Sequence, residues 1–83
     1  MTSIDRNPII AGEPNWRPLE MVLAPCECQD FMYMGRTGEI ELYKHRWTRR
    51  YLNISSDGVR FYRLGGSAYL EISRAEAINH IFS

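Results

Sequence analysis

Alternation of polar and apolar residues runs through the middle of the chain and predicts β-strands. It is clearest at residues 39–43, where every second side chain is apolar, as expected of a strand with one buried face. Asp57-Gly58 between two such segments favours a hairpin, because glycine supplies the positive φ of tight turns. The segments with strand character are residues 31–34, 39–43, 49–54, 59–64 and, as a last addition, 68–72. They predict an antiparallel meander of three to four strands.

The strongest helix signal lies near the C-terminus. Ser73 and Glu76 have the spacing of a capping box, in which each side chain satisfies a free backbone N–H at the start of a helix. The helix over residues 73–82 is expected to place Ile78, Ile81 and Phe82 on one face. A thin meander cannot bury its apolar face alone, so this helix should cover one side of the sheet. The expected fold class is therefore α+β, a small antiparallel β-meander packed against a C-terminal helix.

The N-terminal region is less regular. Residues 1–15 contain two prolines and no hydrophobic period, which predicts an extended arm ahead of a single domain at residues 16–83. A short helix is expected over residues 16–24, because Pro18 suits the first turn of a helix and Pro25 would end it.

Length and composition restrict the class of protein. Eighty-three residues make one small domain with a thin core. No apolar run approaches the roughly 20 residues that a membrane helix requires. Residues 1–6 also lack the basic start of a secretory signal. We therefore expect a cytoplasmic protein that makes no membrane contact.

Charge is unevenly distributed along a chain whose formal net charge is zero. Residues 36–63 hold seven basic and three acidic side chains, so their sum is 7 − 3 = +4, and −4 remains for the two ends. Nine of the ten basic residues are arginine, which makes planar, forked contacts to carboxylates and phosphates. A biased genome composition would also explain the excess of arginine.

The predicted exposed face of the sheet is rich in tyrosine and arginine. The side chains expected to point at the helix are Ile40, Leu42, Leu52, Ile54, Val59 and Phe61. Their neighbours, expected to point outwards, are Glu41, Tyr43, Arg49, Tyr51, Asn53, Arg60 and Tyr62. Tyrosine and arginine are common at binding hot spots because each combines a large area with a polar tip. The predicted partner-binding residues are Tyr43, Lys44, His45, Arg46, Trp47, Arg49, Arg50, Tyr51, Arg60 and Tyr62.

Several occupants fit that face. A protein partner or a second copy of the chain, which would make a homodimer, fits its aromatic character. Nucleic acid or a nucleotide fits the basic block and the stacking capacity of tyrosine, although duplex binders usually carry a positive excess. In the structural alternative, the arm or the Trp16 segment covers the face, or Tyr–Arg pairs merely stabilise the sheet. We expect above all a small non-catalytic protein that modulates or inhibits a protein partner.

Signals for catalysis or metal binding are weak. Four residues of zinc-ligand type are present, namely Cys26, Cys28, His45 and His80. The C-x-C spacing is not that of a usual zinc knuckle, and the histidines lie on separate elements, so we interpret the cysteines as free thiols. Glu39 and Glu41 lie near many arginines and are expected to be ion-paired rather than catalytic. The sequence therefore predicts no enzyme activity, no cofactor and no metal.

Overall fold

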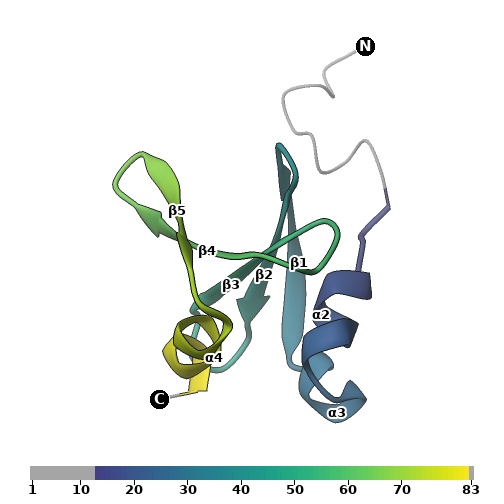
Figure 1. Cartoon of the computed structure of the whole chain (residues 1–83). Coiled ribbons are helices and arrows are strands. Elements are labelled where there is room, and N and C mark those ends of the chain that lie inside the picture. The colour runs from purple at the N-terminus through teal and green to yellow at the C-terminus, as the bar shows by residue number, and fades with distance from the viewer. Residues whose placement is uncertain (1–12, 83) are drawn as a thin grey trace.

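The computed structural model describes residues 13–82, and its fold is α+β (Figure 1). Two short helices, α2 (Arg17–Val22) and α3 (Pro25–Cys28), precede the strands, and α4 (Arg74–Phe82) follows them. The strands are β1 (Phe31–Thr37), β2 (Ile40–His45), β3 (Tyr51–Ser55), β4 (Phe61–Gly65) and β5 (Ala68–Ile72). Residues 1–12 of the expected arm lie outside the described residues, so that prediction is not tested.

The described strands form one meander in the order β1-β2-β3-β4-β5, each antiparallel to the next. The sheet has five strands, whereas the alternation predicts three to four. The last strand, β5, matches the segment expected at residues 68–72 and pairs with β4 along its whole length, from Phe61 opposite Ile72 to Gly65 opposite Ala68. Gly66 has a φ of +69° in the turn between them, a conformation that glycine adopts without strain.

The N-terminal helical region is divided in two. The pattern predicts one helix over residues 16–24, but α2 ends at Val22. Pro25 does not end this helix; it occupies the first helical position of α3, where the missing N–H costs nothing. Glu27 supports that start, since its Oε1 accepts a hydrogen bond from the backbone N–H of Ala24 at 3.0 Å. Within residues 13–82, no helix has the length and apolar character needed to span a membrane.

The capping box of α4 is confirmed. Glu76 N–H donates to Ser73 Oγ, and Ser73 N–H donates to Glu76 Oε1, both at 3.1 Å. The buried face of the helix differs in part from the expected one, because Ala77 and Ile81 are its buried residues. Phe82 is 47% exposed, and its ring packs edge-on against His45.

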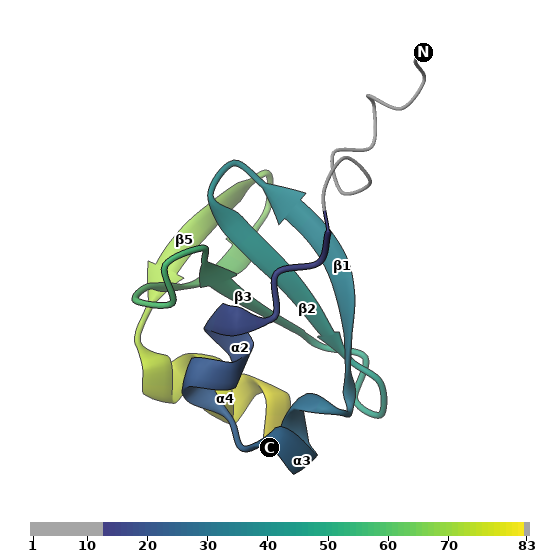
Figure 2. The ribbon, with the colours of Figure 1, turned by 90° about the vertical axis from the view of Figure 1, so that its right-hand side faces the viewer.

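The hydrophobic core lies between the sheet and the helices. Its buried residues are Leu19, Phe31, Tyr43, Leu52, Ile54, Phe61, Ala77 and Ile81. Figures 1 and 2 show α2 and α3 beside β1–β3, while α4 lies against β3 and β4 and the β4–β5 hairpin extends to the side away from α2.

Candidate functional site

The strand register places each residue of β2 on the face of the sheet opposite to the one predicted for it. Glu41 lies opposite Ile54 and Tyr43 lies opposite Leu52. Directly opposed residues share a face, so Glu41 and Tyr43 join Leu52 and Ile54 in the interior, and all four are at most 1% exposed. The prediction that Leu42 points at the helix and Tyr43 points at solvent is wrong, because a shift of one residue exchanges the faces of a whole strand.

Two further residues that were predicted to point at the helix, Ile40 and Val59, do not do so. Ile40 shares a face with Leu42 and is only half-buried. Val59 precedes β4 and is 67% exposed. Phe61 is buried as predicted, at 5% exposure.

The segment before α2 covers the face that holds Tyr43. The Trp16 ring lies 5.7 Å from that of Tyr43 and 5.9 Å from that of Tyr33, measured between centroids. The Tyr43 hydroxyl donates to the backbone carbonyl of Asn15. The structural alternative, in which the Trp16 segment covers the predicted face, is therefore confirmed for Tyr43.

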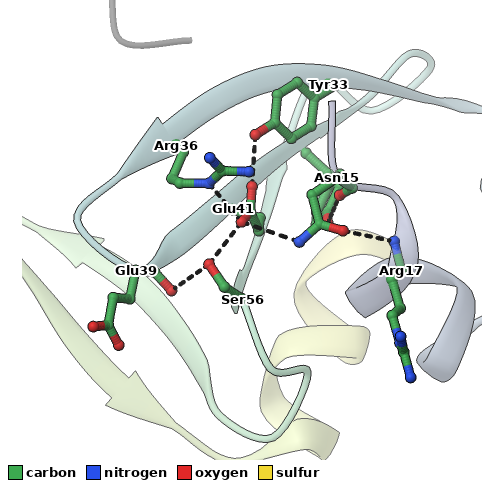
Figure 3. Close-up of polar contacts among 8 residues, drawn as sticks. Asn15, Arg17, Tyr33, Arg36, Glu39, Glu41 and Ser56 are labelled. Carbon is green, nitrogen blue, oxygen red and sulfur yellow. Dashed lines mark hydrogen bonds and ion pairs between the residues drawn. The ribbon is translucent and has the colours of Figure 1, made fainter. Parts of the chain in front are cut away.

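Glu41 is the centre of a buried polar cluster on this covered face (Figure 3). Its carboxylate accepts hydrogen bonds from the Tyr33 hydroxyl at 2.6 Å and the Ser56 hydroxyl at 2.6 Å. Arg36 Nε donates at 2.7 Å and forms an ion pair, and Asn15 Nδ2 donates at 3.3 Å. The expectation that Glu41 is ion-paired is confirmed.

These contacts stabilise the charged carboxylate. Burial alone would raise the pKa of Glu41, but the hydrogen bonds from Arg36, Ser56, Tyr33 and Asn15 outweigh it and lower that pKa below its usual value. Burial, together with the bond to Glu41, raises the pKa of Tyr33 to about 12. Burial also raises the pKa of Tyr43. A carboxylate so fully occupied is a poor general base near neutral pH, so the cluster is structural.

An open groove of about 820 Å³ lies between β2–β5 and α4, and residues that face away from Glu41 and Tyr43, among them Leu42, Asn53 and Tyr62, form part of its wall. We call it the Arg/Tyr groove. Its polar and aromatic lining consists of Arg49, Arg50, Arg63, Tyr51, Tyr62, Tyr69, Asn53, Glu76 and His80. The volume is within the usual range for ligand sites, about 300–1,000 Å³.

The strand register also explains how the tyrosines of this groove come together. Asn53 lies opposite Tyr62 across β3 and β4, and Leu64 lies opposite Tyr69 across β4 and β5. Alternate residues of one strand share a face, so Tyr62 and Tyr69 point to the same side as Asn53. Tyr51 is two residues before Asn53 and 39% exposed.

The charge of the groove is positive, with three arginines against one glutamate. Arg50 Nη1 donates to the His80 carbonyl at 2.8 Å and links the β2–β3 loop to α4. Arg49 has a φ of 66°, a left-handed conformation that costs a non-glycine residue about 1–2 kcal/mol. Glycine would be unstrained there, so the arginine side chain is present despite a backbone cost.

An unpaired oxygen lies at the base of the groove. Asn53 is 3% exposed, and its Nδ2 donates to the Tyr62 carbonyl at 3.3 Å. Its Oδ1 is buried and has no hydrogen-bond partner in the described part of the chain. A buried acceptor without a donor costs about 1–3 kcal/mol.

The ten predicted binding residues do not form one surface. Arg49, Arg50, Tyr51 and Tyr62 line the groove, and the Lys44 ammonium lies 5.8 Å from the centre of the Tyr51 ring. These five therefore lie together as predicted.

The other five lie elsewhere. Tyr43 is in the core, and His45 is 6% exposed with its ring 4.9 Å from that of Phe31. Arg46 and Trp47 are exposed in the β2–β3 loop, where Arg46 lies over the indole. Arg60 lines a separate depression beside α2. The inclusion of Tyr43 and His45 as surface residues is wrong, because β2 turns that side of the strand towards the helices.

Five polar residues of the groove are absent from the predicted binding residues, namely Asn53, Arg63, Tyr69, Glu76 and His80. A signal existed for Tyr69, because a two-residue turn after Gly65 makes it a cross-strand neighbour of Leu64. Glu76 and His80 reach the groove through the docking of α4, which local sequence does not specify.

The residues of zinc-ligand type remain apart. Within residues 13–82, no three His, Cys, Asp or Glu side chains are grouped so that they could hold a metal ion. Cys26 and Cys28 are free cysteines, as expected. Burial raises the pKa of the Cys28 thiol, which keeps it protonated near neutral pH.

Comparison with known proteins adds no functional assignment. No family model, curated protein or solved structure matches this chain.

Proposed function

We propose that this chain is a non-catalytic binding protein whose Arg/Tyr groove takes an acidic segment of a partner protein and thereby modulates or inhibits that partner. The observation that carries this proposal is the groove itself: three arginines and three tyrosines line one concave surface that contains a single carboxylate. Arginine and tyrosine supply charge-assisted hydrogen bonds and large apolar contact areas, the two contributions typical of binding hot spots.

The electrostatics favour an anionic occupant. Arg49 and Arg63 are exposed and have no acidic partner among the described residues. Glu76 is already engaged at the start of α4, where it accepts from Ser73. The charges of Arg49 and Arg63 therefore lack an acidic partner within residues 13–82, and a carboxylate-bearing segment would complement them.

A nucleic acid or nucleotide is the second candidate, and the three groove tyrosines favour it because aromatic rings stack on bases. The charge of the whole chain favours the protein candidate. Because the net charge of the chain is zero and residues 36–63 carry +4, the remaining residues carry −4. That part of the chain would repel a long polyanion.

Fluorescence anisotropy with three labelled probes distinguishes these candidates: a pool of acidic decapeptides, a pool of basic decapeptides and single-stranded RNA oligonucleotides. We expect the acidic pool alone to bind at physiological salt. Arg49→Gly and Arg63→Gln should each weaken binding about tenfold, the loss typical of a contact worth about 1.4 kcal/mol.

Arg17→Gln is the matched control, since Arg17 is an exposed arginine of α2 outside the groove. It removes the same charge and should leave binding within about twofold. RNA binding that falls steeply with salt, without binding of the acidic pool, would support the second candidate. Equal losses from Arg17→Gln and Arg63→Gln would contradict the groove as the site.

A further inference from the structure

The two edges of the sheet differ in how open they are to another strand. β1 is interrupted by a register shift between Tyr33 and Gly35, and such bulges discourage pairing at an edge. β5 is regular along its pairing with β4, and no strand within residues 13–82 pairs with its outer side. Figure 1 shows the β4–β5 hairpin standing away from the helices, so this edge is open.

The hairpin register determines which backbone groups point outwards. Gly65 and Ala68 close a two-residue turn, so Ala68, Leu70 and Ile72 direct their N–H and C=O groups to β4. Tyr69 and Glu71 therefore direct theirs to the free edge. Each free group is a donor or an acceptor that another strand would satisfy.

We propose that a second copy of this chain pairs antiparallel with the outer edge of β5, about a two-fold axis at Leu70, so that the two sheets become one. In this register Tyr69 lies opposite the second copy's Glu71, and their outward N–H and C=O groups exchange hydrogen bonds. The same pair repeats on the other side of the axis, as a two-fold interface requires.

The side chains of β5 are self-complementary in this register. Ala68, Leu70 and Ile72 share one face, and Leu70 is 42% exposed. Leu70 would pack against its own counterpart, and Ala68 against the second copy's Ile72. On the other face, each Glu71 would lie beside a tyrosine rather than another carboxylate.

Neighbouring symmetric registers fit less well. An axis at Glu71 would place two carboxylates directly opposite each other, which is destabilising. An axis at Tyr69 would leave Leu70 opposite the small Ala68 and Glu71 opposite Ser67 in the turn. The register at Leu70 is thus the one that pairs apolar residues with apolar residues and separates the carboxylates.

This association would also join two copies of the candidate site. Tyr69 lines the Arg/Tyr groove and also lies in the proposed interface strand, so the grooves of the two copies would adjoin across the axis. A partner with two acidic segments would then gain affinity through effective concentration. The pairing itself does not depend on what the groove binds.

Sedimentation velocity over a wide concentration range tests the pairing. We expect wild type to pass from monomer to dimer, while Leu70→Lys and Glu71→Pro stay monomeric. Proline at position 71 removes only an outward N–H, so the pairing of β5 with β4 is retained. Leu64→Lys is the matched control, because Leu64 is 58% exposed on the other face of the same hairpin and should leave the dimer intact.

Cysteine cross-linking gives a readout that does not depend on a disruptive substitution. In a Cys26→Ser/Cys28→Ser background, Leu70→Cys should oxidise to a disulfide-linked dimer, because directly opposed residues have Cβ atoms about 4.5–5.5 Å apart. Leu64→Cys should not. Wild type that remains monomeric at millimolar concentration, or cross-linking at position 64 as fast as at position 70, would overturn the proposal.

Discussion

The two faces of the sheet carry the same kinds of side chain and use them differently. On the covered face, Tyr33 and Arg36 direct their polar atoms at the buried Glu41 carboxylate. On the groove side, Tyr62 and the loop residue Arg49 line a concavity whose only carboxylate within residues 13–82 belongs to the helix cap, and Asn53 Oδ1 has no donor there.

The comparison shows that composition alone does not identify a binding surface. Tyrosine and arginine stabilise a fold when a buried acceptor satisfies them, and they remain available to a ligand when none does. The distinction lies in the hydrogen-bond partners, which only the three-dimensional arrangement supplies.

The largest loss of stability is expected when the Glu41 carboxylate, the shared acceptor of the covered face, is replaced. Glu41→Gln leaves the donors of Arg36, Tyr33 and Ser56 with a neutral partner, and we expect a loss of about 2 kcal/mol in the free energy of unfolding, since the buried carboxylate loses its charge-assisted hydrogen bonds. Urea denaturation measures it. Glu39→Gln, at an exposed position, should change stability by less than about 0.5 kcal/mol. Equal effects of the two substitutions would contradict a structural role specific to Glu41.

The same carboxylate should make stability sensitive to acid. The pKa of Glu41 is lowered by folding from 4.5, so its contribution is present above pH 4.5 and is lost as pH falls through the folded pKa. Over that window the stability of wild type should fall more steeply than that of Glu41→Gln, by at most about 1.4 kcal/mol per pH unit, the slope for one proton. Asp57, whose pKa is also lowered by its hydrogen bond from Ser55, is unchanged in both proteins. Parallel curves for the two proteins would be incompatible with this assignment.

Removing one hydroxyl from each face gives a sharper comparison. Tyr33→Phe should cost about 1–2 kcal/mol, because its hydroxyl donates to a charged acceptor. Tyr62→Phe should cost less than about 0.5 kcal/mol, because its hydroxyl has no partner in the described part of the chain. Thermal unfolding of the two variants measures the difference. A larger loss for Tyr62→Phe would mean that the groove face is structural.

No loss of stability is expected at Arg49. Its φ of 66° suits glycine, so Arg49→Gly should leave stability unchanged or raise it by up to about 1 kcal/mol. The variant should nevertheless bind the acidic peptides less well. Reduced stability in urea would show that the arginine side chain has a structural role, contrary to this interpretation.

Local signals in the sequence predicted where helices and turns begin better than they predicted which face of each strand is buried. Ser73 with Glu76 marks the start of α4, and Asp57-Gly58 marks a turn, because short-range hydrogen bonds and backbone conformation determine both. Alternation in β2 shows that Glu41 and Tyr43 share a face. It does not show which face is covered.

The burial of Glu41 depends on residues from several segments. Asn15 precedes α2, Arg36 lies on β1 and Ser56 lies in the β3–β4 turn, so their convergence is a property of the tertiary fold. The Arg/Tyr groove has the same dependence, because it forms only where the β4–β5 hairpin bends and α4 docks. Five of the ten predicted residues lie in or beside it: Arg49, Arg50 and Tyr51 come from β3 and the loop before it, Lys44 from β2 and Tyr62 from β4.

The most direct test of the groove as the binding surface is an NMR titration of the labelled protein with the acidic peptide pool. Backbone amides of Tyr51 and Tyr62, the Nε–H signals of Arg49 and Arg63, and the Asn53 side-chain amide report on the groove. Arg36 Nε–H and the Tyr33 amide report on the covered face. We predict saturable shifts in the first set and little change in the second. Shifts confined to other surfaces, or no saturable shift with acidic peptides, would contradict the proposed function.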